Sequence, residues 1–445
     1  MYKRKIESHL LRWKEKVGHK PLVIKGVRQC GKTSSVLAFA KAHYKHVVYL
    51  DFRAHPEYRM FFYPNLEINE IVLRISATLP SLVIEPHTTC FVFDEIQDCP
   101  IARSSLKYFC LDGRYDVLCT GSLLGVNGYK TKEEQRDEQT ASIPVGFEEI
   151  VNMYPMDFEE WLWANGIREE HIENLCLHLA EESPVDDAIH QRFRSLLLQY
   201  VFVGGMPEAV STFLTVGQIG PLLAVQRQIV DTYKADMVKY ALQADKARIR
   251  ECFESIPRQL ARENKKFTYT VVKPGAKGRD YAGSLQWIED AGIIRRCYNT
   301  QITELPLDGN AIQEQFKVYM ADTGLFISML EDGTQSSILR GDLGAYKGAI
   351  YENLMADILG KMGRKLYYFR KESGLEVDFL IRYKGECVPV ECKARTGNAK
   401  SLRTILNHPE NYHVSHAIKC GDYNVGRTGS LITIPFYMAF LLTEV

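Results

Sequence analysis

The chain has 445 residues, of which 46% are hydrophobic and 25% charged, and its 55 Lys and Arg side chains are matched by 55 Asp and Glu side chains. These values are typical of a globular protein of about three domains, and they exclude intrinsic disorder, collagen and coiled coil. The zero net charge at first argues against a nucleic-acid partner, because proteins that bind phosphate backbones usually carry excess positive charge.

The first residues are charged and then alternate apolar and polar side chains at helical spacing, without the continuous apolar core of a signal peptide. The most apolar stretch, residues 431–442, is too short to span a bilayer and contains Pro435. The eleven cysteines form no CxxC pair and have no zinc-finger spacing, which predicts reduced thiols. We therefore expect a cytoplasmic protein with no membrane partner.

A short apolar run at residues 22–25 precedes the segment GVRQCGKT at residues 26–33, and an amphipathic stretch follows. This order predicts a strand, a GxxxxGK[ST] loop and a helix. Glycines at both ends of such a loop let backbone N–H groups surround the α- and β-phosphates of a nucleotide, and the positive end of the helix faces them. We expect Lys32 to reach the β- and γ-phosphates and Thr33 to hold Mg²⁺. The expected residues of the ATP site are Gly26, Arg28, Gln29, Cys30, Gly31, Lys32, Thr33 and Ser34.

A second buried-strand pattern, residues 89–93, ends in Asp94 and Glu95. An acidic residue at the end of such a strand lies beside the phosphate loop in this class of fold. We therefore expect Asp94 to bind Mg²⁺ through water and Glu95 to orient or deprotonate the attacking water.

Residues 46–52 and 116–122 fit two further strands. Strands that alternate with helices predict a mostly parallel α/β sheet, in which ligands bind at the carboxyl ends of the strands. Thr120 or Ser122 would then end its strand near the γ-phosphate. A turn-forming serine after a glycine explains the same spacing equally well.

The middle of the chain begins with a polar, charged stretch at residues 129–142, which predicts a mobile loop. An amphipathic helix with an acidic face is expected around residues 157–162. The segment 202–208, with two adjacent glycines and a proline, predicts a tight turn between helices.

Residues 248–300 have the pattern of a winged helix-turn-helix, with helices at about 249–263 and 280–291 and lysines and arginines around the second helix. Such cations would contact DNA phosphates. The second helix, however, exposes Gln286 and two carboxylates, which suit DNA poorly. Both a DNA-binding module and an internal or protein-docking module stay open.

The last third predicts a helix that carries Glu352, followed by strands at 366–370, 376–381 and 388–394. Alternation places Glu391 and Lys393 on the same face of the last strand, and a hairpin would bring Asp378 next to them. Burying these groups is costly unless they bind a divalent metal or each other. One interpretation is therefore a Mg²⁺-dependent phosphodiesterase site, and the other is a hairpin with a set of salt bridges.

Ordered blocks across nearly the whole chain resemble prokaryotic AAA-type ATPases, grouped with the STAND-like signalling NTPases, that carry a C-terminal domain of restriction-endonuclease fold. The blocks are GVRQCGKT, FVFDE, LCTGSLLG, YPMDFEEWLWA, YVFVGGMPEAV, KVYMADTGL, GAIYENLMADIL, YYFRKESGLEVDFLI and PVECKA. No residue is identified as an arginine finger. The resemblance implies Glu95, Asp378, Glu391 and Lys393 as catalytic residues, and metal ligation by Thr33, Asp94, Glu352, Asp378 and Glu391.

The expected fold class is α/β, with an N-terminal P-loop NTPase parallel sheet, a helical and winged-helix middle, and a C-terminal α/β domain of PD-(D/E)xK type. The expected domains are 1–155 for the ATPase core, 156–245 for a helical lid or linker, 246–310 for the winged-helix module and 311–445 for the nuclease-like domain. The expected ligands are ATP, Mg²⁺ and nucleic acid, and protein partners and a homo-oligomer stay open.

The leading functional hypothesis is an ATP-binding and ATP-hydrolysing switch that controls a nuclease-like domain acting on nucleic acid. The alternative is an ATP-dependent regulatory protein whose nuclease-like domain is an inactive binding module for proteins. The zero net charge does not exclude a nucleic-acid partner, because charge is unevenly distributed along the chain. Residues 131–190 hold 3 basic and 16 acidic side chains. Residues 234–296 hold 14 basic and 8 acidic side chains, and residues 345–405 hold 12 basic and 7 acidic ones. These regions are either solvated faces that pair with each other or basic surfaces that an acidic segment covers in one state.

Overall fold

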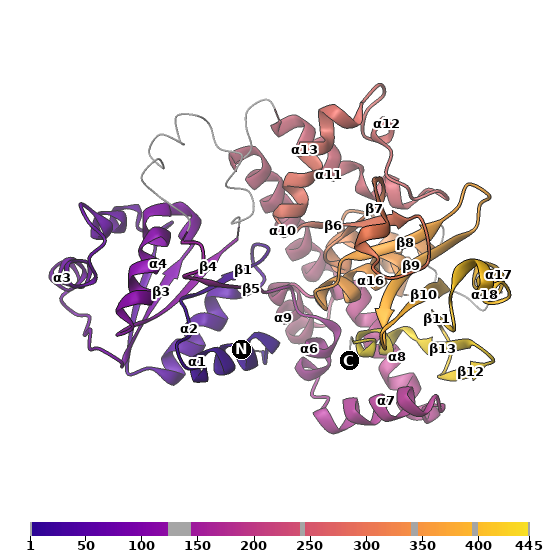
Figure 1. The fold of residues 1–445 in the computed structure, drawn as a ribbon, viewed down its shortest axis with the longest axis horizontal. Coiled ribbons are helices and arrows are strands. Elements are labelled where there is room, and N and C mark those ends of the chain that lie inside the picture. Colours follow the sequence, from indigo (N-terminus) through magenta and orange to yellow (C-terminus); the bar gives the residue numbers. More distant parts are fainter. Residues whose placement is uncertain (1, 123–143, 241–244, 340–345, 394–398, 444–445) are drawn as a thin grey trace. The chain divides into compact units, whose positions relative to one another are not determined.

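The computed structural model of the chain describes residues 2–122, 144–240, 245–339, 346–393 and 399–443. These residues divide into two compact units (Figure 1), one made of residues 3–154 and 236–246 and the other of residues 155–235 and 247–445. We call them the N-terminal unit and the second unit. The loop expected at residues 129–142 lies outside the described residues.

The N-terminal unit alternates strands and helices in the order that the sequence predicts. Its elements are α1 (Lys5–Glu15), β1 (Leu22–Lys25), α2 (Lys32–His43), β2 (His46–Asp51), the 3₁₀ helix η1 (Pro56–Phe62), α3 (Ile68–Thr78), β3 (Thr89–Asp94), η2 (Ile96–Asp98), α4 (Pro100–Asp112), β4 (Asp116–Gly121) and β5 (Glu149–Asn152).

The five strands form one sheet in the order β2-β3-β4-β1-β5, and every neighbouring pair is parallel. The expected parallel sheet is thereby confirmed. One face of the sheet packs against α3 and α4 through a continuous apolar core that includes Val23, Phe91 and Phe93 from the strands and Leu106 from α4. Because all strands run in one direction, the carboxyl ends of β1, β3 and β4 meet at one edge, where β1 and β3 lead into the predicted ATP-site residues.

The second unit begins with helices and continues with a mixed sheet. Its elements are α6 (Phe158–Ala164), α7 (Glu169–Glu181), α8 (Asp187–Val203), α9 (Pro207–Val216), α10 (Ile219–Tyr240), α11 (Lys246–Leu260), α12 (Tyr269–Val272), α13 (Gly278–Asp290), β6 (Ile294–Thr300), η4 (Asp308–Asn310), β7 (Ala311–Met320), α14 (Thr323–Ser328), α15 (Thr334–Leu339), α16 (Lys347–Lys361), β8 (Leu366–Arg370), β9 (Glu376–Tyr383), β10 (Glu386–Lys393), α17 (Lys400–Leu406), α18 (Pro409–Tyr412), β11 (Ala417–Gly421), β12 (Gly426–Thr428), β13 (Leu431–Pro435) and η6 (Phe436–Leu441).

The eight strands of the second unit lie in the order β12-β13-β11-β10-β9-β8-β6-β7. The antiparallel pair β6 and β7 follows α11, α12 and α13, in the order of a winged helix-turn-helix. This pair is not a separate wing, however, because β6 also pairs in parallel with β8. The boundary expected at 310/311 therefore falls between two paired strands, and the sheet joins regions that the sequence places in different domains.

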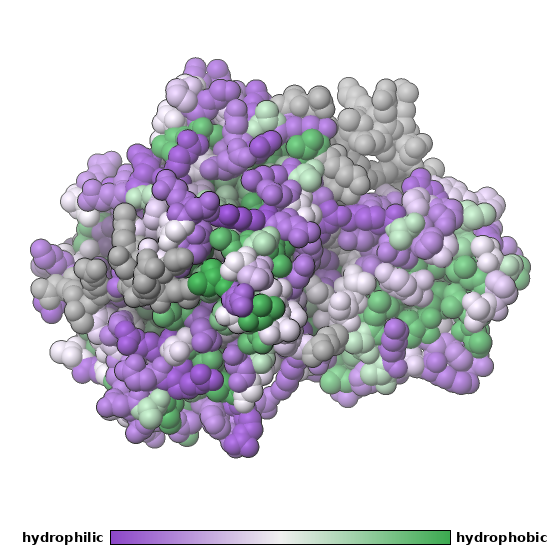
Figure 2. Space-filling model, turned by 180° about the vertical axis from the view of Figure 1, so that it is seen from behind, coloured by the Kyte–Doolittle hydropathy of each residue, from purple (hydrophilic) through white to green (hydrophobic). Residues whose placement is uncertain are grey.

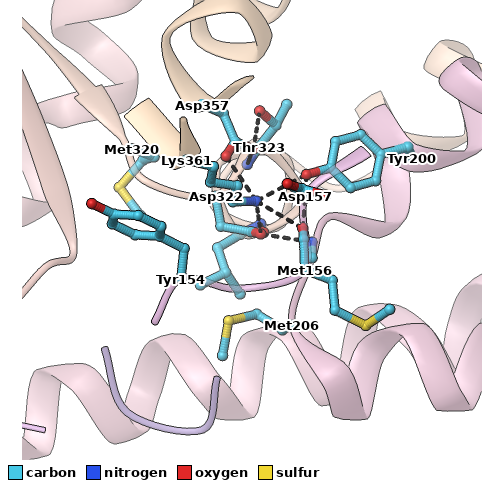
Figure 3. Close-up of polar contacts among 12 residues, drawn as sticks. Tyr154, Met156, Asp157, Tyr200, Met206, Met320, Asp322, Thr323, Asp357 and Lys361 are labelled. Carbon is cyan, nitrogen blue, oxygen red and sulfur yellow. Dashed lines mark hydrogen bonds and ion pairs between the residues drawn. The ribbon is translucent and has the colours of Figure 1, made fainter. Parts of the chain in front are cut away.

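A buried charge cluster connects several segments of the second unit (Figure 3). The ammonium group of Lys361 lies 2.7 Å from Asp357 Oδ1 and 3.3 Å from Asp322 Oδ2, and it donates hydrogen bonds to Tyr200 Oη and to the Met156 carbonyl oxygen. Lys361, Asp322 and Asp357 are each at most 2% exposed at the side chain. The cluster therefore fixes α16, α14, α8 and the segment before α6 to one another through direct contacts.

Two glycines let the backbone approach this cluster. A Cβ at Gly205 would lie 1.9 Å from the Met156 carbonyl oxygen, and a Cβ at Gly324 would lie 2.5 Å from the Val203 carbonyl oxygen. The N–H of Gly205 donates a 2.7 Å hydrogen bond to Asp322 Oδ2. The predicted turn at 202–208 is confirmed, since α8 ends at Val203 and α9 begins at Pro207.

Polar and charged side chains cover much of the face in Figure 2, while apolar residues gather in separate patches. All eleven cysteines are free thiols, as the sequence predicts. Among the described helices, none combines the length and the apolar character that crossing a membrane requires.

Candidate nucleotide site and carboxylate centre

The loop between β1 and α2 has the backbone geometry of a phosphate-binding loop. Gly31, the last residue before α2, has a φ of 97°, a region that favours glycine. A Cβ at Gly26 would lie 2.0 Å from the Met153 carbonyl oxygen, so only glycine fits at the start of the loop. Lys32 is 6% exposed, and its ammonium group donates hydrogen bonds of 3.0 and 2.9 Å to the carbonyl oxygens of Gly26 and Val27. The lysine therefore closes over the loop in which phosphates would bind.

The expected Mg²⁺ residues meet at the ends of β3 and α2. Thr33 Oγ1 donates a 2.9 Å hydrogen bond to Asp94 Oδ1, and Thr120 donates to the same oxygen. Tyr49, from β2, donates a 2.8 Å hydrogen bond to Asp94 Oδ2. Burial and this bond to Asp94 raise the pKa of Tyr49, so the phenol remains a donor at neutral pH. A hydroxyl and a carboxylate side by side fit the way a P-loop protein holds Mg²⁺.

Glu95 lies beside these groups and is held by several polar contacts. Its backbone has a φ of 51°, a conformation that a non-glycine residue adopts at a cost. Its carboxylate accepts hydrogen bonds from Gln97 and, at 3.2 Å, from Ser122 Oγ, and it lies 3.4 Å from an Arg53 Nη1. The contact with Ser122 brings together two residues that the sequence assigns separately to the site.

The remaining residues predicted for the loop have different surroundings. Arg28 forms an ion pair with Asp236, which lies in the last part of α10, the part that belongs to the N-terminal unit. Cys30 is fully buried and its thiol contacts the Met153 carbonyl oxygen at 3.5 Å, so its side chain serves packing. Gln29 has a φ of 63°, and Ser34 is exposed in the first turn of α2.

Two contributors to this site were not predicted, namely Tyr49 and Arg53. Both come from β2 and the turn after it, at a sheet position next to β3. No motif identifies them, because their proximity follows from the strand order. In the register of β2 and β3, Asp51 lies opposite Asp94, and this pairing places Tyr49 and Arg53 beside the site.

The carboxylate centre of the second unit forms where β9 and β10 pair. The two strands are antiparallel with Val390 opposite Phe379, which confirms the expected hairpin. Asp378 Oδ2 accepts a 2.8 Å hydrogen bond from the N–H of Cys392, and Glu391 forms an ion pair with Lys393. The other carboxylate oxygen of Glu391, Oε2, is buried and has no hydrogen-bond partner.

Glu352, the expected helix carboxylate, is held by two lysines that the sequence did not reveal. Lys265, from the segment between α11 and α12, forms an ion pair with Glu352 Oε1, and Lys317, from β7, lies 3.8 Å from Oε2. Lys317 also lies 2.6 Å from a carboxylate oxygen of Glu376. Tyr319 donates a 3.1 Å hydrogen bond to Glu352 Oε2. Both oxygens of Glu352 therefore have protein partners.

Electrostatics tie these groups into one centre. Burial raises the pKa of Asp378 to about 7, and the charge of Glu352 adds to this, while Lys317 opposes it. Burial also acts to raise the pKa of Glu352, but Lys317 and Lys265 outweigh it and leave that pKa below its ordinary value. The charges of Glu352 and Glu376 outweigh burial and raise the pKa of Lys317. The carboxylates are thus balanced by buried or half-buried ammonium groups.

We tested whether these residues fit a metal ion. In the part of the chain that the structure describes, no group of three or more His, Cys, Asp or Glu side chains has an arrangement that could hold one. Of the carboxylates that the sequence assigns to a metal here, Glu352 is engaged by Lys265 and Lys317 and one oxygen of Glu391 by Lys393. Asp378 accepts its hydrogen bond from the backbone N–H of Cys392. We therefore derive no reaction step through a metal ion at this centre.

Comparisons with known proteins match three parts of the chain. Residues 18–162 match the family model described as an AAA domain, residues 194–336 match a domain of unknown function, DUF8612, and residues 347–437 match another, DUF4143. A search of curated proteins gives no match.

Solved structures give distant matches. A Walker-type ATPase of Pyrococcus abyssi is 13% identical, with 74% of this chain and 96% of that chain covered and a TM-score of 0.40. The ORC1 protein of Aeropyrum pernix, solved in complex with DNA, is 12% identical, with coverages of 77% and 93% and a TM-score of 0.29. A STAND protein of Pyrococcus horikoshii with a tetratricopeptide repeat sensor is 12% identical, with coverages of 81% and 45% and a TM-score of 0.27. The parallel sheet and the loop after β1 show that residues 18–162, which match the model of an AAA domain, have a P-loop NTPase fold.

Proposed function

We propose that the protein binds and hydrolyses ATP and that its nucleotide state acts as a switch on the second unit. The observation that carries this proposal is the contact of Thr33 with Asp94, next to Glu95 and below the Lys32 loop. When bound, Mg²⁺ would neutralise charge on the phosphates and orient them. Lys32 would face the β- and γ-phosphates, Thr33 and Asp94 would hold the metal, and Glu95 would orient or deprotonate the attacking water.

The contacts of Glu95 suggest how hydrolysis is restrained before nucleotide binds. Arg53 and Gln97 both engage its carboxylate, and Arg53 also donates a 2.9 Å hydrogen bond to Asp98 Oδ2. A carboxylate held by two donors is less available to accept a proton from water. A change in these contacts would therefore accompany assembly of the hydrolytic site.

For the second unit we propose action on nucleic acid through the carboxylate centre. The shared neighbourhood of Asp378, Glu391 and Lys393 supports this proposal, because a carboxylate can accept a proton from an attacking water and an ammonium group can stabilise negative charge that develops on a phosphodiester. The second candidate is a regulatory protein whose centre binds partners without cleavage. It is favoured by the ion pairs of Lys265 and Lys317 with Glu352, which satisfy that carboxylate within the protein.

A nuclease assay separates the two candidates. Under the nuclease proposal, the full chain degrades DNA or RNA in an assay run both with a chelator and with added Mg²⁺ or Mn²⁺. Asp378→Ala or Lys393→Ala lowers the rate about 100-fold or more, as loss of a preorganised charged group does. ATP hydrolysis stays unchanged, since the two sites use different residues. Lys400→Ala, which removes an exposed lysine of α17, is the matched control and cleaves normally.

Absence of cleavage of every form of DNA and RNA, with and without ATP, would contradict the nuclease proposal and support the binding module. Lys265→Ala adds a further readout. Because it frees one oxygen of Glu352, a nuclease that Lys265 restrains becomes faster in this variant, whereas a binding module stays inactive.

A further inference from the structure

A buried arginine at the start of the chain contacts the backbone of the phosphate loop. Arg4 stands directly before α1 and is only 5% exposed. Its Nη1 donates a 2.9 Å hydrogen bond to the carbonyl oxygen of Cys30, and its Nη2 donates a 2.7 Å hydrogen bond to the carbonyl oxygen of Tyr154. The planar guanidinium group holds both acceptors in one fixed arrangement. The sequence did not identify this residue, because 150 positions separate Arg4 from Tyr154.

The hydrogen bond to Cys30 bears on phosphate binding through the geometry of the peptide group. The carbonyl group of Cys30 and the N–H of Gly31 belong to one planar peptide group and point in nearly opposite directions. Gly31 stands directly before α2, where the N–H groups of such a loop face a bound phosphate. Because Arg4 holds the carbonyl oxygen, it also restricts the direction of this N–H. A phosphate that accepts a hydrogen bond from the N–H would polarise the peptide group and strengthen its bond to Arg4.

The hydrogen bond to Tyr154 lies where the chain leaves the N-terminal unit. Pro155 follows directly and begins the second unit. The ring of a proline fixes its φ, and the residue before a proline is largely restricted to extended conformations. The connection from Tyr154 to Met156 therefore has few alternative conformations, so a change at the carbonyl group of Tyr154 also affects the backbone of Met156.

The second unit holds the backbone of Met156 at both its N–H and its carbonyl group. The N–H donates a 2.7 Å hydrogen bond to the Gly205 carbonyl oxygen. The carbonyl oxygen accepts hydrogen bonds from Tyr200 Oη at 2.9 Å and from the ammonium group of Lys361 at 3.2 Å (Figure 3). Breaking a buried hydrogen bond leaves its donor or acceptor unsatisfied, which costs free energy. A displacement of Met156 would therefore change the contacts of the buried charge cluster around Lys361.

We propose that Arg4 is a positioning residue of the nucleotide site and that it couples phosphate binding to the backbone of Met156. It directs the Cys30–Gly31 peptide group toward the phosphates, and through Tyr154 it makes Met156 respond to the occupancy of the loop. The inference rests on the proposed binding of ATP and deepens it by naming the side chain through which the second unit responds. Coupling between two sites is reciprocal, so the loss of Arg4 both weakens nucleotide binding and removes the response.

The test is hydrogen–deuterium exchange of the full chain with and without a saturating, slowly hydrolysed ATP analogue and Mg²⁺. The affinity for the analogue is measured by calorimetry on the same samples. In the unchanged chain we expect the analogue to slow exchange of the Met156 amide about fivefold or more, the lower end of typical coupling between two sites. Arg4→Lys keeps the charge but lacks the planar fork that holds both carbonyls. This variant binds the analogue about tenfold more weakly, and at saturation its Met156 amide no longer responds.

Arg12→Lys is the matched control, because Arg12 is exposed on α1, and it binds and responds as the unchanged chain does. A merely structural role of Arg4 would speed exchange equally with and without the analogue, which leaves the response intact. A full response in Arg4→Lys therefore overturns the inference, as does the absence of a response in an unchanged chain that binds the analogue. An unchanged chain that does not bind the analogue contradicts the proposed function as well, and the calorimetric titration identifies this outcome.

Discussion

Replacing Lys32 with alanine weakens ATP binding about 10- to 100-fold, the range expected when hydrogen bonds from a charged group to phosphate are lost. It also lowers the hydrolysis rate of bound ATP by roughly 10²- to 10³-fold, because a preorganised charge no longer stabilises the transferred phosphoryl group. The structural reason is the position of the ammonium group, which donates hydrogen bonds to the carbonyl oxygens of Gly26 and Val27 at the start of the loop. The measurements are titration with a slowly hydrolysed ATP analogue and a phosphate-release assay.

Lys41→Ala is the control for this experiment. Lys41 lies on the same helix α2 but is exposed to solvent, so its removal changes total charge without touching the loop. Equal ATP affinity in Lys32→Ala and in the unchanged chain would contradict the assignment of this loop as the nucleotide-binding site.

Replacing Lys361 with methionine lowers the free energy of unfolding of the second unit by about 3–5 kcal/mol, the cost of leaving a buried charge without its partner. The methionine has a similar volume, so packing changes little. Asp322 and Asp357 remain buried without the ammonium group that bridges them. Chemical denaturation followed by circular dichroism measures this effect.

Lys365→Met is the matched control four residues later. Lys365 pairs with Asp308 at the surface, where both side chains are more than half exposed. Surface pairs contribute about 0–1 kcal/mol, so this variant loses little stability. Similar losses in the two variants would contradict the structural role of the buried cluster.

The pH dependence gives a second readout of the same cluster. Burial and the charge of Asp322 raise the pKa of Asp357 to about 6, although Lys361 opposes the rise. The folded chain therefore binds this proton more tightly than the unfolded chain. Its contribution to stability is complete below the ordinary pKa of Asp and is lost as the pH rises through about 6. In Lys361→Met the pKa rises further, so the loss extends to higher pH.

The phosphate-binding loop and its neighbouring strands could be predicted from the sequence because their signals are local. Glycines at 26 and 31 and the apolar runs before Lys25 and Asp94 specify a loop and two strands within a few residues. The structure has those strands at β1 and β3. Strand β5, by contrast, has the sequence EIVN, which is too short and too acidic to stand out, and its place beside β1 follows from long-range pairing.

The carboxylate centre was predictable only in part, because some of its residues are brought together by contacts between distant parts of the chain. Alternation along β10 and its hairpin pairing with the preceding strand, β9, identified Glu391, Lys393 and Asp378. Lys265 and Lys317 lie 87 and 35 positions before Glu352, and no local pattern links a lysine to a carboxylate across such distances. Their presence changes the chemistry of the centre, since it provides the charge balance that a metal would otherwise provide.

The most direct test of the switch is ATP hydrolysis by the full chain and by Glu95→Gln, with nucleotide binding measured in parallel. Glutamine has nearly the same shape, and its carbonyl oxygen can still accept the hydrogen bonds from Gln97 and Ser122. Its amide nitrogen cannot replace the oxygen that faces Arg53, and the side chain cannot accept a proton from water. We expect Glu95→Gln to bind ATP as tightly as the unchanged chain and to hydrolyse it about 10²- to 10⁴-fold more slowly, as loss of a general base does. Hydrolysis at the same rate in both proteins would contradict the account.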